Sequence, residues 1–416
     1  MIKKSFAFVF TTILFFSVFP AQAKINIPGA DGSDGALQIT MTTEVDLSEA
    51  VTGNWDDNNS ANSGKGIYDP QKWAVVFKYD SVYIDAGSIL SFKNHPSRAP
   101  VVWLVNGDVT INGTLSLNGE GYQNPPKNAE PGPGGFRGGI GRYKTIINGA
   151  GFGPGGGNPT GDFGYGGSYG TQAVGSNLKY GNQSLIPLIG GSGGGTDSEC
   201  SKSGGAGGGA ILIACQNTLI VNGIIQTNGG SPGDVGDCEP AGGSGGGVRL
   251  VAEILSGSGS INAIGGIGYK NAGMGLIRIE RVVNDNNLEV VPGPSVINLS
   301  SDSTAIIWPP DNAPKVKIIS IGDKNAPEDP RSSFGTYGAD VALPEVSSTQ
   351  IVVETTNVEE ASQVVVRVTP RFNANFSIVS AVVESIESED PLIIRWVADL
   401  PVNVGYSAVQ VKVIRP

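Results

Sequence analysis

The only histidine of the chain, His95, lies between two cations, Lys93 and Arg98, in the segment KNHPSRAP. Histidine is a common general base near neutral pH, and flanking cations neutralise the carboxylate of a uronate sugar, as polysaccharide lyases require. No carboxylate or nucleophile lies at a fixed spacing from these residues. A single histidine in an exposed loop usually has a structural role, so the three residues are weak catalytic candidates and the sequence leans away from an enzyme.

Four aspartates near the start of the chain are weak candidates for metal ligands, namely Asp31, Asp34, Asp56 and Asp57. Calcium binds clustered carboxylate and carbonyl oxygens, but this spacing does not match the twelve-residue calcium loop and its closing glutamate is missing. Asp and Asn beside glycine are typical of turns. We therefore expect no cofactor and no metal, with calcium as the alternative that these residues leave open.

A glycine-rich interval over residues 120–203 carries scattered aromatic side chains. Glycine at this density builds no ordinary hydrophobic core; it forms an extended flexible loop or packs as left-handed helices with three residues per turn. The aromatics either form a recognition surface for sugar rings or a protein partner, or they attach the interval to the rest of the molecule. The predicted binding residues are Phe136, Phe152, Phe163, Tyr165 and Tyr169.

Two of the three cysteines hold equivalent places in consecutive copies of a repeat. Cys200 lies ten residues before Ala210, and Cys238 lies ten residues before Val248. Stacked copies would bring equivalent α-carbons near the range that a disulfide tolerates, which predicts a Cys200–Cys238 bond. Cys215 falls inside a strand and is expected to be a buried free thiol, which makes a zinc site of three cysteines less favourable.

The repeat itself is the strongest pattern in the chain. Residues 101–119 match residues 211–229 without a gap, at a separation of 110, and Val75 matches Val102 at a separation of 27. A further copy follows, with Ala210 matching Val248. Like residues at like positions indicate parallel stacking rather than hairpins, because each copy has one apolar face that only a neighbour can bury.

The predicted stacked segments are Val75–Phe92, Val101–Gly119, Ala210–Gly229 and Val248–Ile264, with Ile84, Ile111 and Val221 in one internal column. The fold class is therefore all-β: a right-handed parallel β-helix (solenoid) with a long glycine-rich insert, followed by an immunoglobulin-like β-sandwich of about seven short strands. The expected organisation is a signal peptide (1–23), an N-terminal cap (24–72), the β-helix (73–283, insert 120–203), a proline-rich linker (284–312) and the sandwich (313–416).

The first 23 residues have the pattern of a secretory signal peptide. Lys3 and Lys4 precede an apolar run, and Ala21-Gln22-Ala23 supplies small residues for cleavage. The formal net charge of the chain is −11, and removal of this acid-free leader makes it more negative. That charge argues against nucleic acid as a partner. We expect a secreted or cell-surface protein with no membrane span after signal removal.

The segments WAVVFKYDSVYIDAGSILSF and GGGAILIA, with NGIIQTNGG, resemble glycine-rich secreted bacterial proteins that are predicted to form right-handed parallel β-helices. The resemblance covers roughly residues 29–283 and implies that fold, but no assigned activity. More loosely, the glycine runs resemble the glycine-rich tips of phage and cell-surface adhesins. The motifs of pectate lyases and polygalacturonases are absent.

Two classes of function follow from these patterns. The first is a non-catalytic structural or adhesive protein that binds an extracellular glycan or a cell-surface protein through its glycine-rich face. The alternative is a polysaccharide lyase or hydrolase on a β-helix scaffold. A basic or carboxylate cluster on one lateral face would favour the enzyme, and an exposed aromatic face without such a cluster would favour the binding protein.

Overall fold

A computed structural model describes residues 24–57, 59–124, 127–142, 149–175, 179–197, 201–233, 238–330, 339–344, 348–371, 375–402 and 404–416. The structure is all-β with parallel sheets, which confirms the predicted all-β class. The only helices in the described ranges are the 3₁₀ turns η1 (Leu47–Glu49) and η2 (Ser60–Asn62). No helix within these ranges is long and apolar enough to cross a membrane. The predicted leader lies outside the described residues.

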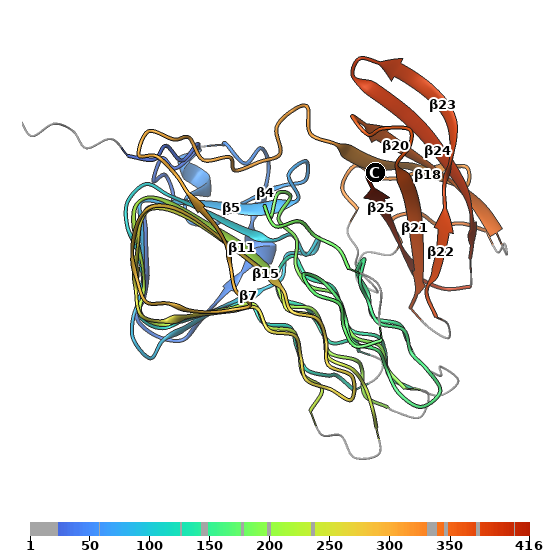
Figure 1. Cartoon of the computed structure of the whole chain (residues 1–416), viewed down its shortest axis with the longest axis horizontal. Helices are drawn as coiled ribbons and strands as arrows, with labels where there is room; N and C mark the ends of the chain where they lie inside the picture. The colour runs from blue at the N-terminus through green and yellow to red at the C-terminus, as the bar shows by residue number, and fades with distance from the viewer. Residues whose placement is uncertain are drawn as a thin grey trace, which may run out of the picture.

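Two sheets form the first region, which we call the parallel-sheet region (Figure 1). The larger sheet contains β1 (Ala36–Ile39), β3 (Val51–Thr52), β4 (Ile67–Asp69), β5 (Ala74–Tyr79), β6 (Ser81–Ile84), β8 (Val101–Val105), β9 (Val109–Ile111), β11 (Ala210–Val221), β13 (Gly247–Gly257), β15 (Leu276–Asn286) and β17 (Ser295–Asn298). The smaller sheet contains β2 (Thr43–Asp46), β7 (Ile89–Lys93), β10 (Thr114–Ser116), β12 (Ile224–Gln226), β14 (Ser260–Asn262) and β16 (Glu289–Val291). Among these strands, only β4 and β5 pair antiparallel.

The self-match at 110 residues is confirmed as physical pairing. β8 pairs parallel with β11, with Val101 opposite Ile211 and Val105 opposite Cys215. The same separation holds where β9 meets β11 and where β10 meets β12. Alternate residues of these strands face one core, so a sequence match at one spacing also places like apolar side chains over one another.

Two of the predicted registers are wrong by one residue. Val75 pairs with Val101 rather than Val102, because the bend after β8 is one residue longer than the bend after β5; the separation of 27 is restored at Val82 and Val109. Ala210 pairs with Gly247 rather than Val248.

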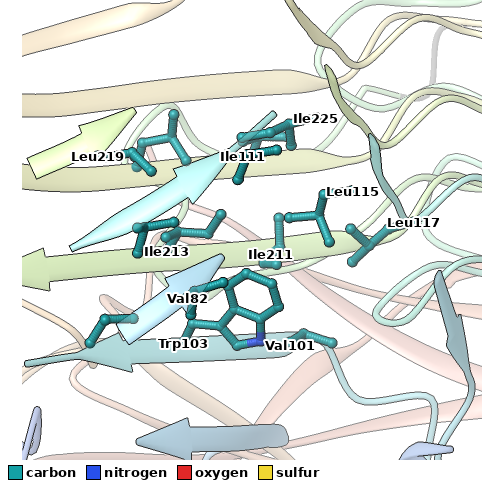
Figure 2. Close-up of a cluster of buried hydrophobic side chains, with 14 of the residues drawn as sticks. Val82, Val101, Trp103, Ile111, Leu115, Leu117, Ile211, Ile213, Leu219 and Ile225 are labelled. Atoms are coloured by element: carbon teal, nitrogen blue, oxygen red, sulfur yellow. The ribbon is translucent and has the colours of Figure 1, made fainter. Parts of the chain in front are cut away.

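The hydrophobic core lies between the two sheets. Ile84, Ile111 and Val221 are fully buried in-register neighbours, which confirms the predicted column. Figure 2 shows the core side chains around Trp103, which converge from β8, β9, β11 and β12. Leu47 of η1, in the segment predicted as a cap, is a fully buried member of this core.

The parallel sheets continue beyond the predicted boundary at residue 283. β15 extends to Asn286, and β16 and β17 follow within the segment that was expected to be a linker. Further along this segment, Ala305 and Ile307 are buried against the outer face of the larger sheet together with Ile25 and Ile27. The segment therefore contributes strands and packing.

Glycine-rich segments extend sideways from the parallel-sheet region, toward the lower right of Figure 1. Their hydrogen bonds recur every three residues: the N–H groups of Gly204, Gly207 and Ala210 donate to the carbonyls of Gly139, Phe136 and Pro133. A period of three is that of polyproline II helices, which supports the packed alternative for the insert. We call these segments the glycine bundle: residues 117–121, 129–141, 149–157, 163–173, 189–197, 203–210, 227–231, 240–247, 263–267 and 272–275.

The last region, at the upper right of Figure 1, consists of two antiparallel sheets around one core. One sheet contains β18 (Lys315–Ile321), β19 (Lys324–Asn325), β20 (Ser348–Thr356), β23 (Val382–Glu389) and β24 (Leu392–Pro401). The other contains β21 (Gln363–Pro370), β22 (Ser377–Ser380) and β25 (Ser407–Ile414). In the core, Trp396 donates its indole N–H to Thr355 over 2.8 Å, so its polar atom is satisfied.

Candidate functional site

The glycine bundle carries an aromatic–lysine cluster, which we define as Phe163, Tyr165, Tyr269 and Lys270. The last two residues lie at the midpoint of segment 263–275, which leaves the smaller sheet after β14 and returns to the larger sheet at β15. The first two begin a segment of the insert. The cluster therefore joins the insert to a turn of the parallel-sheet region.

The rings of the cluster contact one another directly. The ring centroids of Phe163 and Tyr165 are 5.3 Å apart in an edge-on arrangement, and those of Phe163 and Tyr269 are 5.4 Å apart with an interplanar angle of 38°. Lys270 Nζ lies 5.0 Å from the Phe163 centroid and 4.9 Å from that of Tyr269. Tyr269 is 55% exposed and Lys270 is partly exposed, so the cluster presents one aromatic ring to solvent beside a cation.

Backbone hydrogen bonds and a glycine next to the tyrosine ring hold the cluster in place. Gly164 N–H donates to the carbonyl of Glu239 over 3.0 Å, and Tyr165 N–H donates to that of Asn158 over 2.9 Å. Gly175 has a φ of +77°, and a Cβ placed on it would lie 2.4 Å from Tyr165 Cε1. Glycine thus lets the tyrosine ring lie directly against main chain, and the hydrogen-bonded bundle limits the movement of the cluster.

The five aromatics predicted to bind have different positions. Phe163 and Tyr165 are half-buried members of the cluster, whereas Tyr169 is fully buried and donates to the carbonyl of Ile189 over 2.8 Å. Phe152 is also buried, and Phe136 is half-buried against Gly153 inside the bundle. Tyr169, Phe152 and Phe136 therefore pack inside the bundle, which is the alternative role that the sequence leaves open for these aromatics. Burial raises the pKa of the Tyr169 hydroxyl.

Sequence reasoning missed Tyr269 and Lys270, because they lie outside the predicted insert. The signal for them is the segment GGIGYKNAG, in which an aromatic and a lysine interrupt a glycine run.

The candidate catalytic residues do not converge. Lys93 forms an ion pair with Asp46 at 2.5 Å. His95 was expected to be exposed, but it is only 4% exposed: its ring stacks on Tyr68 at 4.1 Å, and its Nδ1 lies 2.8 Å from Ser97 Oγ. The histidine is thus held by neighbouring side chains within the fold.

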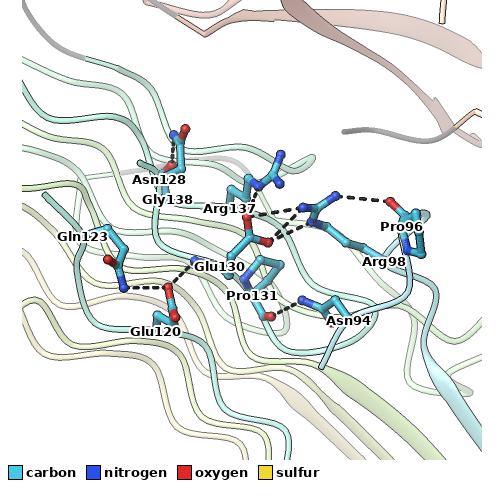
Figure 3. Close-up of polar contacts among 10 residues, drawn as sticks. All are labelled: Asn94, Pro96, Arg98, Glu120, Gln123, Asn128, Glu130, Pro131, Arg137 and Gly138. Carbon is cyan, nitrogen blue, oxygen red and sulfur yellow. Dashed lines mark hydrogen bonds and ion pairs between the residues drawn. The ribbon is translucent and has the colours of Figure 1, made fainter. Parts of the chain in front are cut away.

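Arg98 forms an ion pair with Glu130, whereas Lys93 pairs with Asp46. Its guanidinium contacts Glu130 at 3.0 Å, and Arg137 contacts the same carboxylate at 2.6 Å, as Figure 3 shows. Asn94 donates to the carbonyl of Pro131 nearby over 2.7 Å. These contacts connect the loop after β7 to the start of the insert, so Arg98 positions the glycine bundle.

Three of the four aspartates considered as metal ligands, Asp31, Asp34 and Asp57, have protein partners for their carboxylates, and the fourth, Asp56, is exposed. Asp31 pairs with Lys78 at 3.1 Å, and Asp34 accepts hydrogen bonds from the backbone of Lys78 and Gly64. Asp57 accepts from Asn59 N–H, as expected in a turn. Among the described residues, no group of three potential ligands surrounds a common point.

The predicted disulfide falls partly outside the described residues, because Cys200 lies in a gap. Cys238 is described and is not a free thiol, but no disulfide pair is seen within the described ranges, so the Cys200–Cys238 bond stays a prediction. Cys215 is a buried free thiol, as expected, and burial raises its pKa.

Comparison with known proteins adds no relative. No protein-family model, no curated protein and no solved structure matches the chain. The function has to be argued from the geometry of the site.

Proposed function

We propose that this protein is an exported, non-catalytic binding protein that attaches to an extracellular glycan or a cell-surface partner through its glycine bundle. The observation that carries the proposal is the aromatic–lysine cluster, in which the exposed Tyr269 ring is supported by half-buried neighbours on a hydrogen-bonded backbone. Pyranose rings have an apolar face of C–H groups, and an exposed aromatic ring offers a complementary surface. The separate partners of Lys93, His95 and Arg98 favour this function over that of a lyase.

We also propose that the parallel-sheet region is a right-handed parallel β-helix and that residues 313–416 form an immunoglobulin-like sandwich. Parallel pairing at equivalent positions supports the first, and two antiparallel sheets around one core support the second. In this architecture the β-helix is a rigid support, its lateral turns form the glycine bundle, and the sandwich packs against the bundle. The signal-peptide pattern supports export to the cell surface or medium.

A glycan array probed with the purified protein tests the function. We expect binding to at least one class of oligosaccharide, and we expect Tyr269→Ala to weaken it severalfold while leaving the thermal unfolding midpoint unchanged. Tyr83→Ala is the matched control, because Tyr83 of β6 is also exposed and lies outside the bundle. A parallel assay for new reducing ends or unsaturated sugars on polysaccharides tests the alternative; cleavage that is lost in His95→Ala would establish an enzyme.

A further inference from the structure

Lys270 is a positioned cation without a carboxylate partner. Some other lysines pair with acids, such as Lys78 with Asp31 at 3.1 Å and Lys93 with Asp46 at 2.5 Å. Others contact neutral oxygens, as Lys412 does at the carbonyl of Lys179. Within the described part of the chain, no carboxylate lies within ion-pair distance of Lys270 Nζ, and its close contacts are the faces of two rings. The negative faces of the rings hold the ammonium in place but do not neutralise it.

The surroundings of this cation are aromatic and apolar. Tyr269 is more than half exposed, and Ile267, on the same turn, is 70% exposed. Exposed apolar side chains next to a positioned charge are typical of a binding site that combines stacking with one directional polar contact. A neutral sugar would use only the aromatic part of this surface.

We propose that the aromatic–lysine cluster binds an anionic sugar residue, with the pyranose stacked on Tyr269 and its carboxylate or sulfate group paired with the ammonium of Lys270. This inference rests on the proposed glycan-binding function and specifies the chemical class of its ligand. It assigns recognition to two residues on one turn of the parallel-sheet region, Tyr269 and Lys270, while Phe163 supports both of them from the insert.

The acidic character of the whole chain is compatible with such a ligand. Its formal net charge is −11, so long-range electrostatics oppose the approach of an anion. That opposition is screened beyond a Debye length of about 10 Å at 0.1 M salt, whereas a contact pair at Lys270 is screened much less. One cation also distinguishes this cluster from the basic grooves that bind nucleic acids.

The test is isothermal titration of the purified full chain with three oligosaccharides of equal length. The first is an oligogalacturonate, the second is the same oligosaccharide with its carboxylates methyl-esterified, and the third is a sulfated galactose oligosaccharide. We expect an anionic ligand to bind about tenfold more tightly than the neutral ester, as a charge-assisted hydrogen bond gives. The carboxylated and sulfated arms identify which acid group is preferred.

Variants connect this preference to the cation. Lys270→Gln should remove the difference between acid and ester, and Lys270→Arg should retain most of it. Lys324→Gln is the matched control, because Lys324 is an exposed lysine of the C-terminal region paired with Asp323, and it should bind like the parent protein. Both Lys270 variants should nearly keep the parent unfolding midpoint, because the side chain is partly exposed and forms no ion pair in the described part of the chain.

Two results would overturn the inference. Equal affinity for the acid and the ester, or unchanged acid binding in Lys270→Gln, would show that charge at this position is not recognised. If neutral glycans bind as tightly as acidic ones and Tyr269→Ala abolishes the binding of both, the proposed function stands while the anionic ligand is rejected. If no glycan of either kind binds, both proposals fail.

Discussion

Arg367 of β21 donates from Nη2 to the carbonyl of Gly151, over 2.9 Å and 216 residues away in sequence. The same nitrogen donates to Gly156 over 3.1 Å, and Nε donates to Thr369 over 3.0 Å. The side chain is 5% exposed, and its guanidinium also lies 3.7 Å from the centroid of Phe376. A single arginine of the C-terminal region thus satisfies backbone carbonyls of the glycine bundle.

Replacing Arg367 with Met should destabilise the contact between the two regions. The methylene packing is largely kept, but at least two buried carbonyls lose their donor, at a cost of about 2–4 kcal/mol in the free energy of unfolding. Urea denaturation measures the change. Arg395→Met is the control, since Arg395 is 42% exposed and its ion-pair distances are 3.9 and 4.0 Å. Equal stability of the two variants would contradict the importance of this contact.

The glycine bundle should not tolerate a methyl group at its inner positions. A Cβ on Gly208 would lie 1.9 Å from the carbonyl oxygen of Thr227; the oxygen is a main-chain atom and the backbone fixes the position of Cβ, so neither can turn away. We expect Gly208→Ala to cost at least about 3 kcal/mol, at the upper end for overpacking, or to prevent folding. Gly293→Ala is the control, because no atom lies within 4 Å of that Cβ. Thermal unfolding of both variants measures the difference: the midpoint should fall in Gly208→Ala and stay at the parent value in Gly293→Ala, and equal midpoints would contradict the prediction.

The repeat made the parallel pairing predictable, but not its exact register everywhere. Alternate residues of each strand face the same core, so Val101 and Ile211 have the same environment and the same residue class. The one-residue error at Val75 arises because the bend after β8 contains one more residue than the bend after β5. An additional residue in a bend does not alter the alternation of apolar residues in the strands, so the sequence pattern does not reveal it. For the glycine bundle, composition indicates three residues per turn. It does not identify neighbouring segments, because glycine has no side chain that specifies a partner.

The candidate site was predictable only in part. Phe163 and Tyr165 stood out as aromatics in a glycine-rich insert, but nothing local distinguished them from Tyr169, which is buried. Tyr269 is more than 100 residues further along the chain and is brought to Phe163 by pairing of the glycine segments. The burial of His95 likewise depends on Tyr68, which no local pattern connects to it.

A buried ion-pair group predicts sensitivity to acid. Glu280 accepts from Arg249 at 2.8 Å and from Arg278 at 2.7 Å. Burial of the carboxyl raises its pKa, but the hydrogen bonds and charges of the two arginines outweigh this, so the pKa lies below the ordinary value of 4.5. A carboxyl with a lowered pKa in the folded state stabilises the protein above that ordinary value, and the contribution is lost as pH falls below it.

We therefore expect the free energy of unfolding of the parent protein to decrease as pH falls below about 4.5. In Glu280→Gln the free energy of unfolding should fall less steeply with pH, because glutamine does not titrate. At pH 7 this variant should be less stable than the parent by about 3–5 kcal/mol, because Arg249 and Arg278 lose their carboxylate partner. Urea titrations between pH 3 and pH 7 measure both effects. Glu289→Gln serves as the control, since Glu289 of β16 is exposed. Parallel pH profiles for the parent and Glu280→Gln would refute the assignment.

The last prediction concerns the three cysteines. Cys215 of β11 is buried and its pKa is raised by burial, so it should not react with a thiol reagent at pH 8 in the folded protein. In denaturant without reductant, we expect one reactive thiol per chain. Peptide mapping under the same conditions should then recover Cys200 and Cys238 in one linked peptide, because their places in consecutive copies differ from the register of Ala210 and Gly247 by one residue only. Three reactive thiols in denatured, unreduced protein would exclude the bond, and rapid labelling of the folded protein would contradict the burial of Cys215.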